Sequence, residues 1–181
     1  GTQDAGCGRR TAMDIQFSTT AQNLWSAGGL LFWIIVYILM VRRGFKDRSY
    51  GMPIVALFVN VAWESYYAFF TDVPMMNKVG AALYLVFDIG VVWTAIKFAK
   101  DDFDSALIKR YLNHVMIVTT VAAFFLIAMF DRAFNDPFGP LSAGFTTMLL
   151  SILMLCMLFR RDSVKGQSFY IGLFILLGDV A

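Results

Sequence analysis

The sequence is poor in charged residues, cysteine, proline and histidine. Charged residues make up 15% of the 181 positions, and the chain has two cysteines, four prolines and one histidine. Two cysteines this far apart give neither a disulfide framework nor a metal site. The chain also lacks a P-loop, an HExxH motif and an aspartate-rich motif for metal-bound diphosphates. No metal or cofactor is therefore expected, and without a basic block no nucleic-acid partner is expected either.

What the sequence does contain is hydrophobic residues in long runs. They make up 59% of the chain, and the mean hydropathy is +0.65, outside the range of ordinary soluble domains. A helix needs roughly 20 apolar residues to cross a hydrocarbon core of about 30 Å. The pattern predicts an all-α, polytopic membrane helical bundle with five full transmembrane helices and a short sixth. The runs cover residues 25–41, 51–70, 79–99, 114–130, 141–159 and 168–181.

The two ends of the chain differ from this pattern. Residues 1–12 have no apolar periodicity, so they are interpreted as a non-native or disordered leader, with Met13 as a plausible start. Residues 13–181 are predicted to form a single transmembrane helical domain. Because the sixth run reaches only about 20 Å as a helix, the domain is expected to be truncated at its C-terminus.

The charged residues predict the topology. Lys and Arg concentrate in the first, third and fifth connections, whereas the second has only Lys78 and the fourth only Arg132. By the positive-inside rule the odd-numbered connections face the cytoplasm, and the N-terminus lies on the opposite side. Asp101, Asp102 and Asp104 in the third connection are interpreted as a solvated helix start.

Carboxylates inside the apolar runs are the main functional signal. There are three, Glu64, Asp88 and Asp179. An ionisable side chain at the centre of a membrane helix costs on the order of 3 kcal/mol, so such residues usually face a bundle interior and mark function. Glu64 and Asp88 are expected at similar depth, because the second and third spans run in opposite directions.

The spacing around these acids predicts two facing stripes. Asn60 and Glu64 are four residues apart and share one helix face, as do Tyr84 and Asp88 on the next span. If the stripes meet, they form a pocket of acids, an amide and aromatic rings. The predicted catalytic residues are Glu64 and Asp88, and the predicted substrate-binding residues are Asn60, Trp63, Tyr67, Tyr84 and Phe87.

A buried carboxyl group surrounded by rings suits acid-initiated carbocation chemistry. Low-dielectric surroundings favour the neutral, proton-bearing form of a carboxyl group. Protonating an epoxide or an alkene creates a cation that ring faces stabilise without attacking it. A polyisoprenoid substrate would reach such a site from the lipid bilayer. The plainer alternative is that the rings are packing residues and that Glu64 only bonds a neighbouring helix.

Several motifs resemble those of a known family. Residues 51–53 (GMP) open the second span, followed by Asn60 and the Trp63-Glu64 pair; Asp88 and residues 166–170 (GQSFY) also fit. Over residues 13–181 the sequence resembles the small seven-helix transmembrane terpene cyclases of fungal meroterpenoid and indole-diterpene pathways, the paspaline-cyclase type, and their bacterial relatives.

The resemblance implies seven transmembrane helices and proton-initiated cyclisation of a prenylated, often epoxidised substrate without a metal or redox cofactor. It makes Glu64 an essential acid and places a second essential acid in the last helix, which this sequence does not contain. A small or hydroxyl residue would be expected at Asp179, which is therefore not predicted to be catalytic.

Two other classes of function stay open at this point. Glu64 and Asp88 could carry charge in a small proton-coupled transporter, although the sequence has no repeat symmetry or broken helices. The protein could also be a non-catalytic membrane scaffold. The sequence leaves open the substrate chain length, the trigger group, the ring pattern of the product and the oligomeric state.

Overall fold

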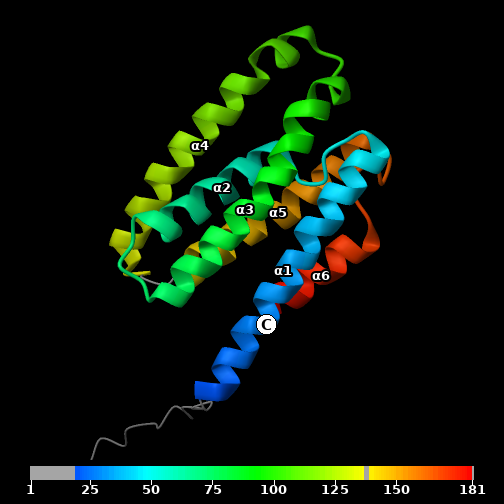
Figure 1. Ribbon diagram of the computed structural model, residues 1–181. Coiled ribbons are helices and arrows are strands. Elements are labelled where there is room, and N and C mark those ends of the chain that lie inside the picture. The colour runs from blue at the N-terminus through cyan, green and yellow to red at the C-terminus, as the bar shows by residue number, and fades with distance from the viewer. Residues whose placement is uncertain (1–18, 137–138, 181) are drawn as a thin grey trace, which may run out of the picture.

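The fold is a bundle of helices (Figure 1). The computed structural model describes residues 19–136 and 139–180; the predicted leader and Met13 lie outside this part of the chain. Every regular element within the described part is helical, which confirms the predicted all-α class. The elements are α1 (Thr19–Asp47), α2 (Ile54–Phe69), α3 (Met75–Phe98), the 3-10 turn η1 (Ala99–Asp102), α4 (Ala106–Phe134), α5 (Pro140–Arg161) and α6 (Phe169–Val180).

Four of these helices are long and apolar enough to cross a membrane: α1, α3 with η1, α4 and α5. The other two are shorter. α2 begins at Ile54, after Pro53, and its 16 residues span about 24 Å. α4 begins eight residues earlier than the apolar run predicts, because Ser105 caps it by accepting a hydrogen bond from the Ile108 N–H at 3.4 Å.

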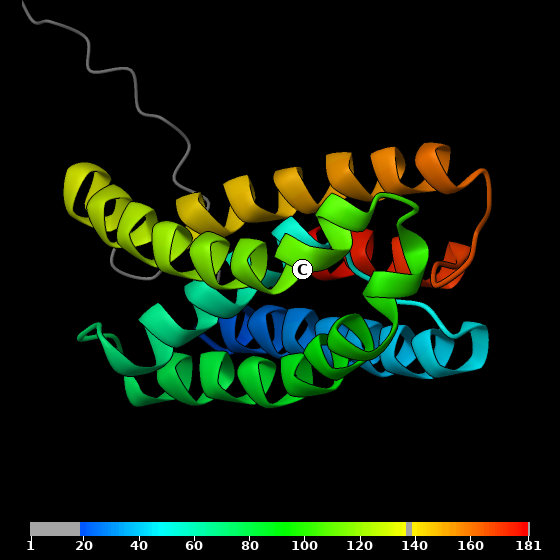
Figure 2. The same cartoon turned by 90° about the horizontal axis from the view of Figure 1, so that it is seen from above.

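α2 occupies the centre of the bundle. It packs against α3, α4 and α5, while α1 packs against α3 and α6. Seen from above, α5 lies along one side of the bundle and α3 along the other (Figure 2). The central position of α2 explains why its side chains can meet residues from several helices at once.

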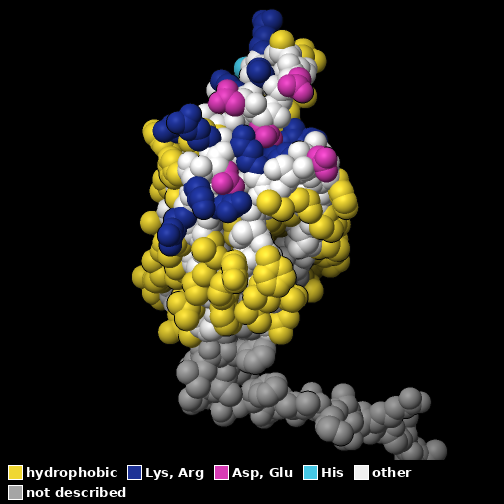
Figure 3. All heavy atoms as spheres, turned by 90° about the vertical axis from the view of Figure 1, so that its right-hand side faces the viewer, with side chains coloured by type: hydrophobic (Ala, Val, Ile, Leu, Met, Phe, Trp, Pro, Cys, Tyr) yellow, Lys and Arg dark blue, Asp and Glu magenta, His cyan; other side chains and the backbone are white. Residues whose placement is uncertain are grey.

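The odd-numbered connections gather at one end of the molecule. The backbone N–H of Gly166, in the fifth connection, donates to the carboxylate of Asp47 at the end of α1 at 2.9 Å. Figure 3 shows Lys and Arg side chains concentrated at this end, above a broad hydrophobic surface. This arrangement fits an integral membrane protein with a charged face at the interface. That this face is cytoplasmic stays a prediction.

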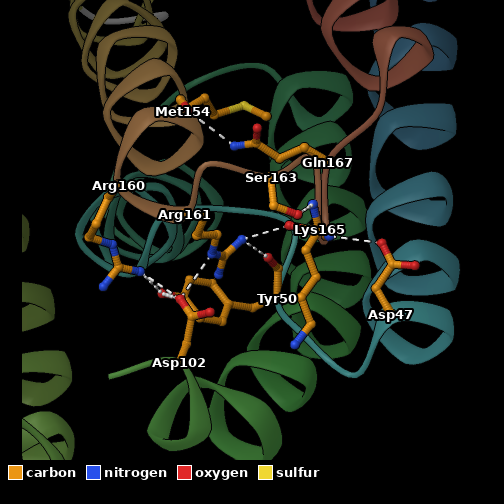
Figure 4. A network of polar contacts seen from close by, with 10 residues as sticks. Asp47, Tyr50, Asp102, Met154, Arg160, Arg161, Ser163, Lys165 and Gln167 are labelled. Carbon is orange, nitrogen blue, oxygen red and sulfur yellow. Dashed lines mark hydrogen bonds and ion pairs between the residues drawn. The ribbon is translucent and has the colours of Figure 1, made fainter. Parts of the chain in front are cut away.

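Asp102 joins the three odd connections in an ionic cluster (Figure 4). Its Oδ2 accepts hydrogen bonds from Arg160 Nη2 at 2.6 Å, from Arg161 Nε at 2.9 Å and from the Tyr50 hydroxyl at 3.0 Å. The prediction of a solvated acid was wrong for Asp102, because the fifth connection folds back over it. Its neighbour Asp101 is exposed, as expected.

The cluster is partly buried, which changes the chemistry of Tyr50. Burial raises the pKa of the Tyr50 phenol above its usual 10.0; Arg161 opposes this rise and Asp102 adds to it. The phenol therefore keeps its proton and acts as a donor. The Arg161 guanidinium lies 4.3 Å from the centre of the Tyr50 ring, and its side chain is only 6% exposed.

The Asp102→Asn variant is expected to lower the free energy of unfolding by about 3 kcal/mol, because it leaves the buried Arg161 charge without its partner. Thermal unfolding of the full-length protein in detergent measures this change. Asp101→Asn removes a charge of the same kind from an exposed position and serves as the control. Equal midpoints for the two variants would contradict a structural role for the cluster.

Candidate active site

A cavity of about 730 Å³ lies between α1, α2 and α5, with further residues from α3 and α6. Its size is typical of sites for small organic ligands. Its wall contains two acids and, among the described residues, no Lys, Arg or His. Aromatic rings and small or hydroxyl residues make up much of the rest, including Trp33, Tyr37, Trp63, Tyr84, Ala143, Gly144, Thr146, Thr147 and Ser151.

Glu64 forms the buried end of this cavity wall. Its side chain is 1% exposed, and its Oε1 accepts hydrogen bonds from the Tyr37 hydroxyl at 2.6 Å and from Asn60 Nδ2 at 2.9 Å. Asn60 precedes Glu64 by one helical turn, so the regular geometry of α2 places the amide beside the carboxyl group. Tyr37 reaches the same oxygen from α1. Donors from two helices therefore fix the orientation of Glu64.

Asn60 also connects Glu64 to Asp88. Its Nδ2 lies 3.1 Å from Asp88 Oδ2 and 2.8 Å from the Tyr37 oxygen. The predicted stripes on α2 and α3 do meet. Together with Tyr37 from α1, they form a polar cluster of four residues: Tyr37, Asn60, Glu64 and Asp88. Asp88 is completely buried and lies outside the cavity wall. It contacts the Glu64 side chain directly and is also bridged to it by Asn60.

No cation neutralises this cluster within the described part of the chain. The ion pairs found there involve Asp47 and Asp102, at the charged end of the molecule. One oxygen of each buried acid, Glu64 Oε2 and Asp88 Oδ1, has no N–H or hydroxyl donor among the described residues, so a hydrogen bond between the two acids requires a proton on one of them. The two carboxyl groups thus share the Asn60 amide, while Glu64 alone accepts a hydrogen bond from the Tyr37 phenol.

The predicted aromatic residues divide into two groups. Trp63 and Tyr84 line the cavity, whereas Tyr67 and Phe87 do not. The Tyr67 hydroxyl donates to the backbone oxygen of Asp136 at 3.0 Å, so this side chain holds the start of α5. The Phe87 ring lies parallel to that of Tyr37, with 6.4 Å between the ring centres, and supports it from behind.

Trp63 is held in place by α5. Its indole N–H donates to Ser142 Oγ at 2.9 Å, and its ring centre lies 4.6 Å from that of Tyr67. Asp136 accepts hydrogen bonds from the backbone N–H groups of Leu141 at 3.1 Å and Ser142 at 2.9 Å, which stabilises the first turn of α5. These contacts hold the Trp63 side chain in place at the cavity wall.

Sequence reasoning missed two residues of the site, Tyr37 and Trp33, and assigned no role to a third, Asp179. Trp33 and Tyr37 are one turn apart on α1, with ring centres 6.0 Å apart, and this i, i+4 pair was the signal that could have found them. Asp179 is not predicted to be catalytic from the sequence, but in the structure it lines the cavity together with Glu64. Which residues of α1 and α6 face α2 depends on helix packing, which spacing within one span does not reveal.

The described residues contain no group of three or more His, Cys, Asp or Glu placed to hold a metal ion. The site presents carboxyl, amide, phenol and aromatic groups. Such groups can donate and accept protons and can stabilise positive charge over ring faces.

Comparison with known proteins gives consistent matches. A family model described as Pyr4-like transmembrane terpene cyclases matches residues 13–181. The chain is 32% identical over 163 residues to terpene cyclase penB of Penicillium crustosum, which covers 87% of this chain and 66% of that protein. It is 34% identical over 173 residues to terpene cyclase andB of Emericella variicolor, which covers 94% of this chain and 73% of that protein.

A third relative, the Pyr4-family terpene cyclase mfmH of Annulohypoxylon moriforme, is 27% identical over 156 residues, covering 83% of this chain and 63% of that protein. The chain thus spans just under two thirds of the length of several curated relatives that it matches. No solved structure matches.

Proposed function

The chain belongs to the family of Pyr4-like transmembrane terpene cyclases, and we propose that the full-length protein is a membrane-embedded terpenoid cyclase whose reaction Glu64 starts. Its substrate is a polyprenyl or prenylated molecule that carries an epoxide or an alkene. The observation that carries the proposal is the position of Glu64, a buried acid at the wall of an aromatic cavity whose described lining contains no Lys, Arg or His. The names of the relatives support the reaction class.

The burial of two acids supports a proton in this cluster. Two ionised carboxylates without a cation would repel each other and would both lack hydration. One shared proton removes most of this penalty. Asn60 donates to both acids and Tyr37 to Glu64, so the cluster holds the carboxyl groups in fixed positions. In this proposal Asp88, Asn60 and Tyr37 are positioning residues, and Glu64 is the donor.

The proposed first step is a proton transfer from the Glu64 carboxyl group to the substrate. With an epoxide, the proton binds the epoxide oxygen, a carbon–oxygen bond breaks and a cation forms on carbon. With an alkene, the proton binds one carbon and leaves the cation on the other. The electrons of a second double bond then close the ring. Tyr37 and Asn60 donate hydrogen bonds to the carboxylate that Glu64 becomes.

The cavity wall supports the later steps. The side chains of Trp33, Trp63 and Tyr84 border the cavity, and an aromatic face attracts a cation by about 0.5–2 kcal/mol without forming a bond. The surrounding helix surfaces are apolar, so a hydrophobic substrate can enter from the bilayer. The chain length of the substrate and the product rings are not specified by these contacts.

Gly144→Leu tests whether this cavity holds the substrate. A Cβ atom added at Gly144 meets no atom within 4 Å, so a larger side chain there has room to extend into the cavity that Gly144 lines. Conversion of a prenylated phenol or indole by the full-length protein in membranes is expected to fall by on the order of 10²-fold, which a misplacement of about 1 Å can cost. Product formation is measured by chromatography with mass detection.

Gly172→Leu is the matched control, because Gly172 also has open space around it but lies on α6 outside the cavity wall. This control is expected to convert substrate at the wild-type rate. Undiminished conversion by Gly144→Leu, with the added side chain tolerated, would place the substrate elsewhere and contradict the proposal.

A further inference from the structure

Asp179 is the second acid of the cavity. Among the described residues that line the cavity, Glu64 and Asp179 are the only acids, and no basic side chain faces them. Asp179 is exposed and forms no ion pair within the described part of the chain. Asp88 is fully buried, contacts Glu64 and Asn60, and is not one of the residues that line the cavity.

The position of Asp179 is set by close packing between α6 and α1. A Cβ atom at Gly178 would lie 2.8 Å from Trp33 Cδ1, so only glycine permits this approach. Ile171 and Ile175 bury the same helix in the bundle, with 0% and 6% exposure. The Asp179 side chain consequently lies beside Trp33 and Thr147, at the cavity wall.

The depth of Asp179 also requires an explanation. It lies about ten residues after the start of α6, or roughly 15 Å along the helix. An ionisable group at such a depth costs on the order of 3 kcal/mol in a membrane helix, and such residues usually serve a function. Asp102 is paired with arginines, whereas Asp179 faces a cavity that contains an acid, aromatic rings and hydroxyl groups.

We propose that Asp179 is the proton acceptor that ends the cyclisation. This inference rests on the proposed function, in which Glu64 creates a cation in the same cavity. The Asp179 carboxylate takes a proton from a carbon next to the final cation. That carbon–hydrogen bond breaks, its electrons form a carbon–carbon double bond, and an oxygen–hydrogen bond forms on Asp179. One proton enters the substrate and one leaves it, so no oxidant, reductant or further reactant is needed.

The arrangement separates the donor from the acceptor. Glu64 is held by two donated hydrogen bonds, one of them from Tyr37, and the Tyr37 ring lies next to that of Trp33, which borders Asp179. The rings therefore lie between the acid that starts the reaction and the base that ends it. A carboxylate is a stronger base than the hydroxyl groups of Thr147 and Ser151, which share this wall. Asp179 is thus the cavity group best suited to accept a proton.

The test compares Asp179→Asn with the wild type as full-length proteins in membranes. The probes are prenylated phenols and indoles with a terminal alkene or epoxide, and products are separated and identified. Removing a general base is expected to lower the rate of forming the wild-type product by on the order of 10²-fold. The cation then loses a proton elsewhere or captures water, so other products take a larger share. Asp72→Asn, an exposed acid between α2 and α3, is the acid-to-amide control.

An unchanged product ratio in Asp179→Asn would overturn the inference, whatever the rate. Complete loss of conversion in a variant with a wild-type unfolding midpoint would also overturn it, because the residue would then be needed to start the reaction. Failure of the proposed function has a different signature: a wild-type protein that converts none of the probes, or a Glu64→Gln variant that converts them normally.

Discussion

Glu64→Gln is expected to lower the conversion of a prenylated substrate by 10² to 10⁴-fold, roughly the range that general acid catalysis contributes. Glutamine has the shape of glutamate, and its amide oxygen can accept the hydrogen bonds that Tyr37 and Asn60 donate to Glu64 Oε1 at 2.6 and 2.9 Å. What the variant lacks is the acidic proton. The expected loss is therefore one of chemistry and not of fold.

The measurement is the initial rate of product formation by the full-length protein in membranes, together with its thermal unfolding midpoint. Asp72→Asn removes an exposed carboxylate outside the site and is expected to leave both quantities unchanged. Cyclised product from Glu64→Gln at the wild-type rate would refute the role of Glu64 as the donor.

Tyr37→Phe is expected to lower kcat by roughly 10²-fold with a smaller change in KM. The hydroxyl donates to Glu64 Oε1 at 2.6 Å, and this bond strengthens when Glu64 gains negative charge on releasing its proton. A hydrogen bond to a charged group is worth about 1.5–3 kcal/mol, which sets the size of the effect. The phenyl ring can keep its place, because it packs against the rings of Phe87 and Tyr84.

Steady-state kinetics of the two proteins separate kcat from KM. Tyr111→Phe, at an exposed position on α4, is the control for removing a phenol hydroxyl. If Tyr37→Phe keeps the wild-type kcat, the hydroxyl does not assist proton release, and the cluster around Glu64 has only a structural role.

The sequence was sufficient to predict the helical class and the meeting of α2 with α3. Hydropathy sets the helices, and the four-residue spacing of Asn60 and Glu64 sets a face without any knowledge of packing. Opposite helix directions then bring Asp88 to the same depth as Glu64. The hydrogen bonds from Asn60 to both acids have the geometry that follows from these two rules.

The parts of the site that could not be predicted depend on contacts between helices. Tyr67 shares the face of Glu64, yet α5 begins beside it, and a Cβ at Gly139 would lie only 2.8 Å from Tyr67 Cζ. Close packing there removes Tyr67 from the cavity. Asp179 enters the cavity for the opposite reason, because Gly178 lets α6 approach α1 closely. Neither approach is visible in the apolar pattern of a single span.

The ionic cluster at Asp102 also depends on contacts between segments that are far apart in the sequence. Three nearby aspartates in a connection are typical of a solvated segment, and Asp101 is exposed as expected. Asp102 is instead paired with Arg160 and Arg161, which are more than 50 residues further along the chain. Such a pairing follows from the return of the fifth connection over the third, and local sequence does not encode it.

The central claim is that Glu64 belongs to a buried pair of acids that holds a proton. Infrared spectroscopy of the full-length protein at neutral pH tests it directly, because a protonated carboxyl group has its own carbonyl band, which shifts in heavy water. The account predicts such a band in the wild type, its loss or displacement in Glu64→Gln, and no change in Asp72→Asn. A wild-type spectrum without the band, or a band that Glu64→Gln leaves untouched, would contradict it.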